Sequence, residues 1–201
     1  MKTLQTTFLP LLLLALACGK NATPVLQKPT AEDVQFVRAA GDSISAVLLK
    51  SLQGTLKQAI GEGDFVNAIS VCNIQALPLT QKLTRWDGYR VRIKRVTGRT
   101  RNPANAPDAF EQKALDYFQQ AGEELPAFLV QKITAGGERV RFRYYKPLKV
   151  GGLCVNCHGP EEMLQPQVRE TLQQLYPNDR ATGYAIGDFR GLVRVELQKD
   201  E

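Results

Sequence analysis

The segment Cys154-Val155-Asn156-Cys157-His158 constrains this chain more than any other feature, because it contains the only histidine among 201 residues. The spacing C-x-x-C-H is the attachment site of a c-type haem. In such sites the two cysteine sulfurs become thioethers on the porphyrin vinyl groups, and the imidazole becomes an axial ligand of the iron. The motif therefore predicts one covalent haem c on Cys154, Cys157 and His158, and it excludes imidazole as the second axial ligand.

Two other chemistries use the same residue types. Cys154 and Cys157 have the spacing of a redox disulfide, but that motif usually opens a helix, whereas the upstream proline and glycines predict a loop. The stronger alternative is a zinc-stabilised ligand-binding module without haem, in which Cys72, Cys154, Cys157 and His158 form a Cys3His set. Adjacent residues such as Cys157 and His158 rarely reach one tetrahedral ion without strain, so haem is favoured.

The N-terminus predicts export. Residues 1–17 carry Lys2 and an apolar stretch too short to span a bilayer, as in a signal peptide. The segment that ends at Cys18 resembles the lipobox of bacterial lipoproteins, although ordinary cleavage nearby would remove this cysteine or leave it unmodified. Residues 18–29 then form a polar tether. We expect a periplasmic or otherwise extracytoplasmic lipoprotein, anchored in the membrane by a lipid on Cys18, which suits covalent haem attachment because that step is extracytoplasmic in bacteria.

Length and charge set further limits. Residues 30–201 are enough for one domain with its own core. A formal charge of +6 is moderate, and the sequence has neither a helix-turn-helix pattern nor an RNA-binding sheet motif. We therefore expect no nucleic-acid partner.

Hydrophobic periodicity predicts helices first and an antiparallel sheet later, which is an α+β fold. Helix signals cover residues 30–60, 65–83 with Pro78 as an interruption, 107–121 and 168–176, and strand signals cover residues 89–93, the hairpin 128–134 and 139–145 around Gly136-Gly137, and two strands within 184–197 that turn at Arg190-Gly191.

The second axial ligand is argued by elimination. Met1 is lost with the leader, and Met163 follows His158 by too few residues to reach the opposite face of the haem. Cys72 is distant in sequence and is left without a thiol partner once the motif cysteines are thioethers. Iron ligation would explain this leftover cysteine, and a small buried apolar role is the alternative.

Six segments resemble one known family, the single-haem c-type cytochromes with a PAS-like fold that are found in cyanobacteria. The resemblance covers residues 34–198. It implies a PAS-like sheet with N-terminal helices and an inserted haem loop, and a cysteine thiolate opposite the histidine that maps onto Cys72. The matching segments are residues 68–72, 101–108, 154–159, 176–179, 181–184 and 187–191.

A haem iron with both axial positions filled disfavours turnover, so we expect no enzyme. A redox or gas sensor and an electron carrier with a redox partner protein both fit. Arginines on two predicted strands are expected on an outer sheet face, where one or two could meet haem propionates or an acidic partner. These are Arg90, Arg92, Arg95, Arg139, Arg141 and Arg143.

Overall fold

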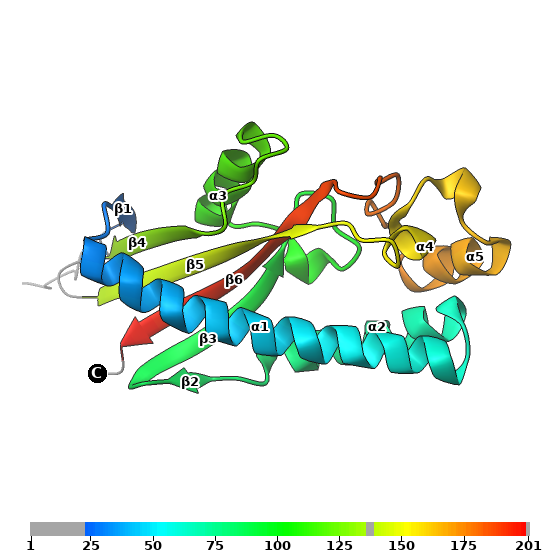
Figure 1. The fold of residues 1–201 in the computed structure, drawn as a ribbon, viewed down its shortest axis with the longest axis horizontal. Coiled ribbons are helices and arrows are strands. Elements are labelled where there is room, and N and C mark those ends of the chain that lie inside the picture. The colour runs from blue at the N-terminus through cyan, green and yellow to red at the C-terminus, as the bar shows by residue number, and fades with distance from the viewer. Residues whose placement is uncertain (1–22, 136–138, 200–201) are drawn as a thin grey trace, which may run out of the picture.

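The computed structural model describes residues 23–135 and 139–199. It has the predicted α+β fold, which combines N-terminal helices with a six-stranded antiparallel sheet (Figure 1). The predicted signal peptide, Cys18 and the Gly136-Gly137 turn lie outside the described residues. No helix in the described part of the chain is long and apolar enough to cross a membrane.

Two consecutive helices form the first part of the fold. α1 (Ala31–Glu62) begins with a capping box on Thr30, and α2 (Phe65–Gln81) begins at Asp64, whose carboxylate accepts a hydrogen bond from an amide of the first turn. The prediction that Pro78 interrupts the second helix is wrong, because α2 continues through it to Gln81. A proline this close to the helix end removes only one late hydrogen bond of the ladder.

The last strand of the chain, residues 189–199, lies near the centre of the sheet. It pairs there with the strand of residues 89–96. The strand order is β1-β4-β5-β6-β3-β2, and every neighbouring pair is antiparallel. The strands are β1 (Val25–Gln27), β2 (Arg85–Trp86), β3 (Tyr89–Val96), β4 (Leu129–Ala135), β5 (Arg139–Lys149) and β6 (Phe189–Lys199).

Two boundaries differ from the sequence prediction. The predicted tether ends in β1, where Leu26 pairs with Ile133 of β4, so the sheet begins before residue 30. The predicted turn at Arg190-Gly191 does not form, because both residues belong to the single strand β6. Gly191 has φ 141°, and a Cβ atom there would lie 2.4 Å from the carbonyl oxygen of Val96. The glycine thus permits close strand packing and does not make a turn.

Helices cover both faces of the sheet. α1 packs on one face, where Gly41 leaves room for the Tyr144 ring and Tyr144 donates a hydrogen bond of 2.5 Å to Asp42 Oδ1. α3 (Ala109–Gln120) covers part of the other face, around Phe118. The sheet therefore has two apolar cores, one on each side.

Beyond the end of the sheet, α1 runs on to meet a separate group of helices (Figure 1). Here α2 packs against α5 (Pro166–Leu175) through Ile69, Val168 and Leu172. The one-turn helix α4 (Val155–His158) and the 3-10 turns η1 (Pro103–Asn105) and η2 (Glu161–Met163) complete the connections. The C-x-x-C-H motif thus lies where the sheet half meets the helical half.

Candidate haem site

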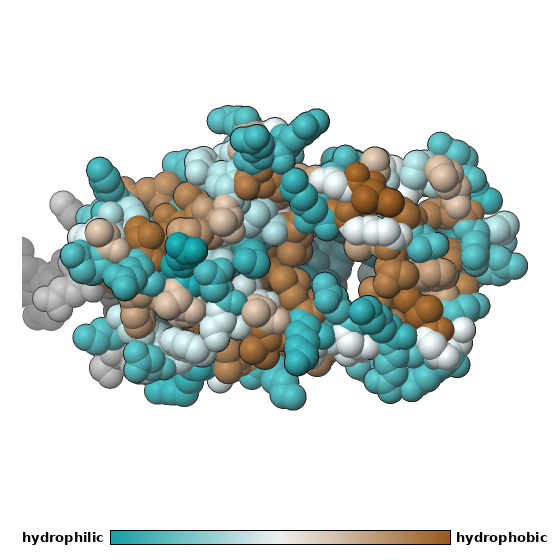
Figure 2. Space-filling view, in the orientation of Figure 1, coloured by the Kyte–Doolittle hydropathy of each residue, from teal (hydrophilic) through white to brown (hydrophobic). Residues whose placement is uncertain are grey.

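A cavity of about 280 Å³ lies between the sheet half and the helical half of the molecule, and the surface is hollowed there (Figure 2). Its apolar wall comes from α1 and α2. Its polar wall comes from β3, from the loop after β3 and from residues 153–158, which we call the haem-motif loop. All four residues proposed from the sequence as haem ligands line it: Cys72, Cys154, Cys157 and His158.

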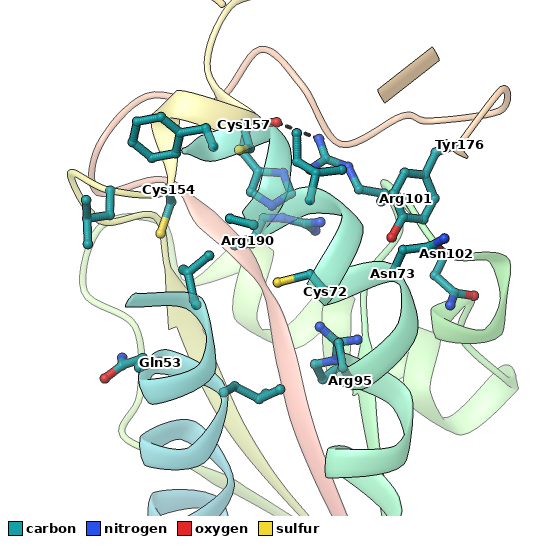
Figure 3. Close-up of a pocket in the computed structure, with 18 of the residues that line it drawn as sticks. Gln53, Cys72, Asn73, Arg95, Arg101, Asn102, Cys154, Cys157, Tyr176 and Arg190 are labelled. Atoms are coloured by element: carbon teal, nitrogen blue, oxygen red, sulfur yellow. Dashed lines mark hydrogen bonds between the residues drawn. The ribbon is translucent and has the colours of Figure 1, made fainter. Parts of the chain in front are cut away.

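The haem-motif loop folds locally into one helical turn. The amide of His158 donates to the carbonyl of Cys154 at 2.8 Å, and the amide of Gly159 donates to Val155 at 2.9 Å. Gly159 must lack a side chain, because a Cβ atom would lie 2.5 Å from the Val155 oxygen. This turn directs Cys154 and Cys157 to the same cavity (Figure 3).

The imidazole of His158 is oriented by the backbone of residues 181–184. Its Nδ1 lies 2.6 Å from the carbonyl oxygen of Ala181, and because a carbonyl can only accept, Nδ1 carries the proton. The amide of Tyr184 donates to the carbonyl of His158 at 2.9 Å and holds the same two segments together. Nε2 is thereby left as the nitrogen available to a metal.

The charge state of His158 suits ligation. Burial lowers the pKa of this imidazole to about 3, and the nearby positive charges of Arg101 and Arg190 add to the effect. A neutral imidazole with a free Nε2 lone pair is the form that binds iron.

Cys72 enters the cavity from α2, below the motif in the view of Figure 3. Burial raises the pKa of its thiol, while the positive charges of Arg95 and Arg101 oppose that rise. Met163, which the sequence argument excluded, is 77% exposed and does not line the cavity. Cys72 is therefore the soft donor that the cavity offers opposite the motif.

The structure does not assemble the zinc alternative. Cys72, Cys154 and Cys157 are spread around the cavity and do not converge on one point (Figure 3). Across residues 23–135 and 139–199, no three His, Cys, Asp or Glu side chains are grouped so as to hold a metal ion. The redox disulfide is not formed either, since Cys154 and Cys157 are both free thiols.

Arg101 ties the motif to the loop that follows β3. Its Nε lies 2.8 Å from Asp179 Oδ2. Its Nη2 donates to the carbonyl of Cys157 at 2.5 Å (Figure 3). The Asp179 carboxylate also accepts from the amide of Ala181, the residue that holds the His158 ring. One guanidinium and one carboxylate thus connect three segments that are distant in sequence.

The predicted outer face of arginines is only partly correct. Arg90 and Arg92 are exposed, but Arg95 lines the cavity and Arg143 is buried under α3 in ion pairs with Glu196 and Asp108. The side chain of Arg139 lies outside the description.

Sequence reasoning missed Arg101 and Arg190 as cavity residues and misplaced Arg95. Alternation along β3 held the signal for Arg95, because odd-numbered Val91 and Ile93 face α1 and Arg95 continues the same face. The prediction failed because it placed Arg95 on the same outer face as the even-numbered Arg90 and Arg92.

The residues present fit a haem c. Two thiols stand at thioether spacing, His158 presents Nε2, and Cys72 supplies a soft donor from another element. The buried Nε of Arg95 has no hydrogen-bond partner among the described residues, as expected for a site built to receive an anionic group.

Comparison with known proteins places the chain in a family. No curated protein matches the sequence. The crystal structure of the cyanobacterial heme-protein Tll0287 is similar in fold, with a TM-score of 0.57 and 21% identity over 86% of this chain and 98% of that chain. The model of the Tll0287-like family matches residues 20–197. This match covers most of the sequence, and the chain belongs to the Tll0287-like family.

Proposed function

We propose that this protein is a c-type haem protein with Cys154 and Cys157 as thioether anchors and His158 as an axial ligand of the iron. The observation that carries the proposal is the His158 imidazole, whose Nδ1–H is held by the Ala181 carbonyl inside a cavity that both motif cysteines line. The relative of known structure is itself a heme-protein, which supports the same cofactor here.

Cys72 is proposed as the second axial ligand. It lines the cavity from α2, and it is the soft donor that the sequence leaves for this position. A thiolate is a strong donor that stabilises ferric iron, and two protein ligands leave no open position for substrate turnover. The proposed role is therefore electron transfer with a redox partner, or redox and gas sensing through release of Cys72, and not catalysis.

An extracytoplasmic location is part of the proposal and is supported by the apolar leader that ends at Cys18. A lipid on Cys18 would anchor the protein in the membrane. Native protein should fractionate with membranes, and Cys18→Ser should release it or block its processing. Recovery of all native protein in the soluble fraction would reject the anchor.

Haem staining of a denaturing gel tests the cofactor directly, because only thioether-linked haem stays with the unfolded chain. Protein matured in a host with a c-type assembly system should stain. Cys154→Ser or Cys157→Ser should weaken the stain, and the double variant should abolish it. A native protein that carries zinc and no haem would refute the proposal.

The Cys72 ligand has its own test. Cys72→Ala should leave the haem covalently attached but convert the ferric spectrum from low-spin to high-spin, because an axial donor is lost. The matched control is Ser70→Ala, since Ser70 lies on the same helix and does not line the cavity. An unchanged spin state in Cys72→Ala would make Cys72 a packing residue only.

A further inference from the structure

The haem cavity has a strong charge imbalance. Three guanidinium groups line it, those of Arg95, Arg101 and Arg190, whereas no aspartate or glutamate is among its lining residues. Buried arginines are ordinarily paired with carboxylates, because an uncompensated charge inside a protein is costly. The cavity thus favours an anionic group.

Two of these arginines already have protein partners. Arg101 pairs with Asp179 at 2.8 Å, and Arg190 Nη1 donates to Thr97 Oγ1 at 2.9 Å and to the carbonyl of Arg99 at 3.3 Å. Both guanidinium groups are thus held in part by the protein itself.

Arg95 is different. Its buried Nε has no hydrogen-bond partner among the described residues. Burial lowers the pKa of its guanidinium, and the groups that oppose this shift when they are ionised, Cys72 and Tyr176, are not carboxylates. A buried donor without a partner in a native fold requires an explanation, and a ligand that binds there is one.

The position of Arg95 matches the anionic end of a haem. Thioether bonds to Cys154 and Cys157 would hold the vinyl side of the porphyrin, and the two propionates stand on the opposite side of the ring. In Figure 3, Arg95 lies below Cys72, on the far side of Cys72 from Cys154 and Cys157. An arginine fork is well matched to a carboxylate.

We infer that Arg95 binds one haem propionate and supplies its counter-charge inside the cavity. This inference rests on the proposed function, since it needs the covalent haem. It assigns to Arg95 a binding and positioning role toward the cofactor. A positive charge lost near the iron favours the ferric form, so removal of Arg95 should lower the reduction potential.

The test uses holoprotein matured with covalent haem. Arg95→Gln removes the charge, Arg95→Lys keeps it, and Arg90→Gln is the matched control, because Arg90 lies on the same strand with an exposed side chain. Redox titration should show a downward shift of the potential in Arg95→Gln, a smaller one in Arg95→Lys and almost none in Arg90→Gln. In resonance Raman spectra, the propionate bending band should shift more in Arg95→Gln than in Arg95→Lys or Arg90→Gln.

The outcomes separate this inference from the proposed function. Native protein without covalent haem rejects the proposed function itself. If the haem stays attached in Arg95→Gln and the propionate band is unchanged, only the role of Arg95 is rejected. The same holds if the iron–sulfur vibration shifts while the propionate band does not, because Arg95 would then act on Cys72. If Arg95→Gln does not accumulate, a crystal structure of the native holoprotein decides: a propionate oxygen about 3 Å from the Arg95 guanidinium supports the inference, and two propionates turned away from it overturn it.

Discussion

Two groups of arginines in this protein, one buried and one half-buried, differ in where their counter-charge comes from. Under α3, Glu196 Oε2 lies 2.7 Å from Arg143 Nε and 2.9 Å from Arg194 Nη1, and Glu111 lies 3.2 Å from Arg194 Nε. We call these four residues the Glu196 network. In the haem cavity, the lining includes three arginines and no carboxylate.

The two groups also differ in how their surroundings shift the pKa values of the arginines. Although burial alone would lower it, Tyr145 and Glu196 keep the pKa of Arg143 above its usual value. Burial lowers the pKa of Arg95 and Arg190 with less compensation. The Glu196 network thus has its counter-charges within the chain and serves the fold. Arg194 Nε also lacks a hydrogen-bond partner among the described residues, but it lies 3.2 Å from Glu111 Oε1, whereas no carboxylate lines the cavity beside Arg95. A buried guanidinium without its own carboxylate is a pointer to a ligand.

The largest effect should come from Glu196→Gln, which removes the carboxylate that Arg143 and Arg194 share. Among the described carboxylates, Arg143 then keeps only Asp108, and Arg194 keeps only Glu111. Removal of one partner from a buried ion pair typically costs about 3–5 kcal/mol. We expect a loss of that order in the free energy of unfolding, measured by urea denaturation, with the haem spectrum unchanged. The exposed Glu124→Gln is the control. A loss below about 1 kcal/mol would contradict the role assigned to the network.

Acidification should show the same contribution by another route. Although burial alone would raise it, Arg194 and Arg143 hold the pKa of Glu196 below its ordinary value of 4.5. A carboxylate with a depressed folded-state pKa adds stability above its unfolded-state pKa and loses it as the pH falls through the folded-state value. Native protein should therefore lose more stability below pH 4.5 than Glu196→Gln does. Parallel stability curves for the two proteins would speak against this.

Arg101 shares features with both groups of arginines, because it lines the cavity and also has a carboxylate partner, Asp179. Arg101→Gln removes the contacts to Asp179 and to the Cys157 carbonyl, and hydrogen bonds of charged groups are worth about 1.5–3 kcal/mol. We expect a loss of about 2 kcal/mol in urea denaturation. Asp179→Asn should cost a similar amount, and the double variant should cost less than the sum. Strict additivity would mean that the pair does not act as a unit.

The smallest effect should come from Arg92→Gln. Arg92 also meets Glu196, at 3.4 Å, but its side chain is 54% exposed. Exposed ion pairs contribute about 0–1 kcal/mol, so thermal and urea unfolding should hardly change. If Arg92→Gln lost nearly as much unfolding free energy as Glu196→Gln, the exposure of an arginine would not decide how much its ion pair contributes.

Particular elements show how far the sequence could predict the structure. The first two helices and the alternating strand β3 follow from residues close together in the chain, and they were predicted close to their observed positions. The capping box at the start of α1 was not predicted. The expectation of a loop at the C-x-x-C-H motif was wrong, because Val155–His158 form the one-turn helix α4. The single strand β6 was missed, because Gly191 is explained only by the approach of Val96 from the neighbouring strand. β1 was missed because three residues of strand depend on an existing edge at β4.

The sequence by itself determined the chemical inventory of this protein: one histidine beside two correctly spaced cysteines, a leftover Cys72, and two strands that carry several arginines. Those properties depend on composition and on near neighbours. Only the tertiary structure decided which arginine would meet a carboxylate and which would face the cavity. Strand alternation assigns a side chain to a face, but its burial and its partner depend on what covers that face. Here α3 covers Arg143 beside Glu196, and α2 covers Arg95 beside Cys72.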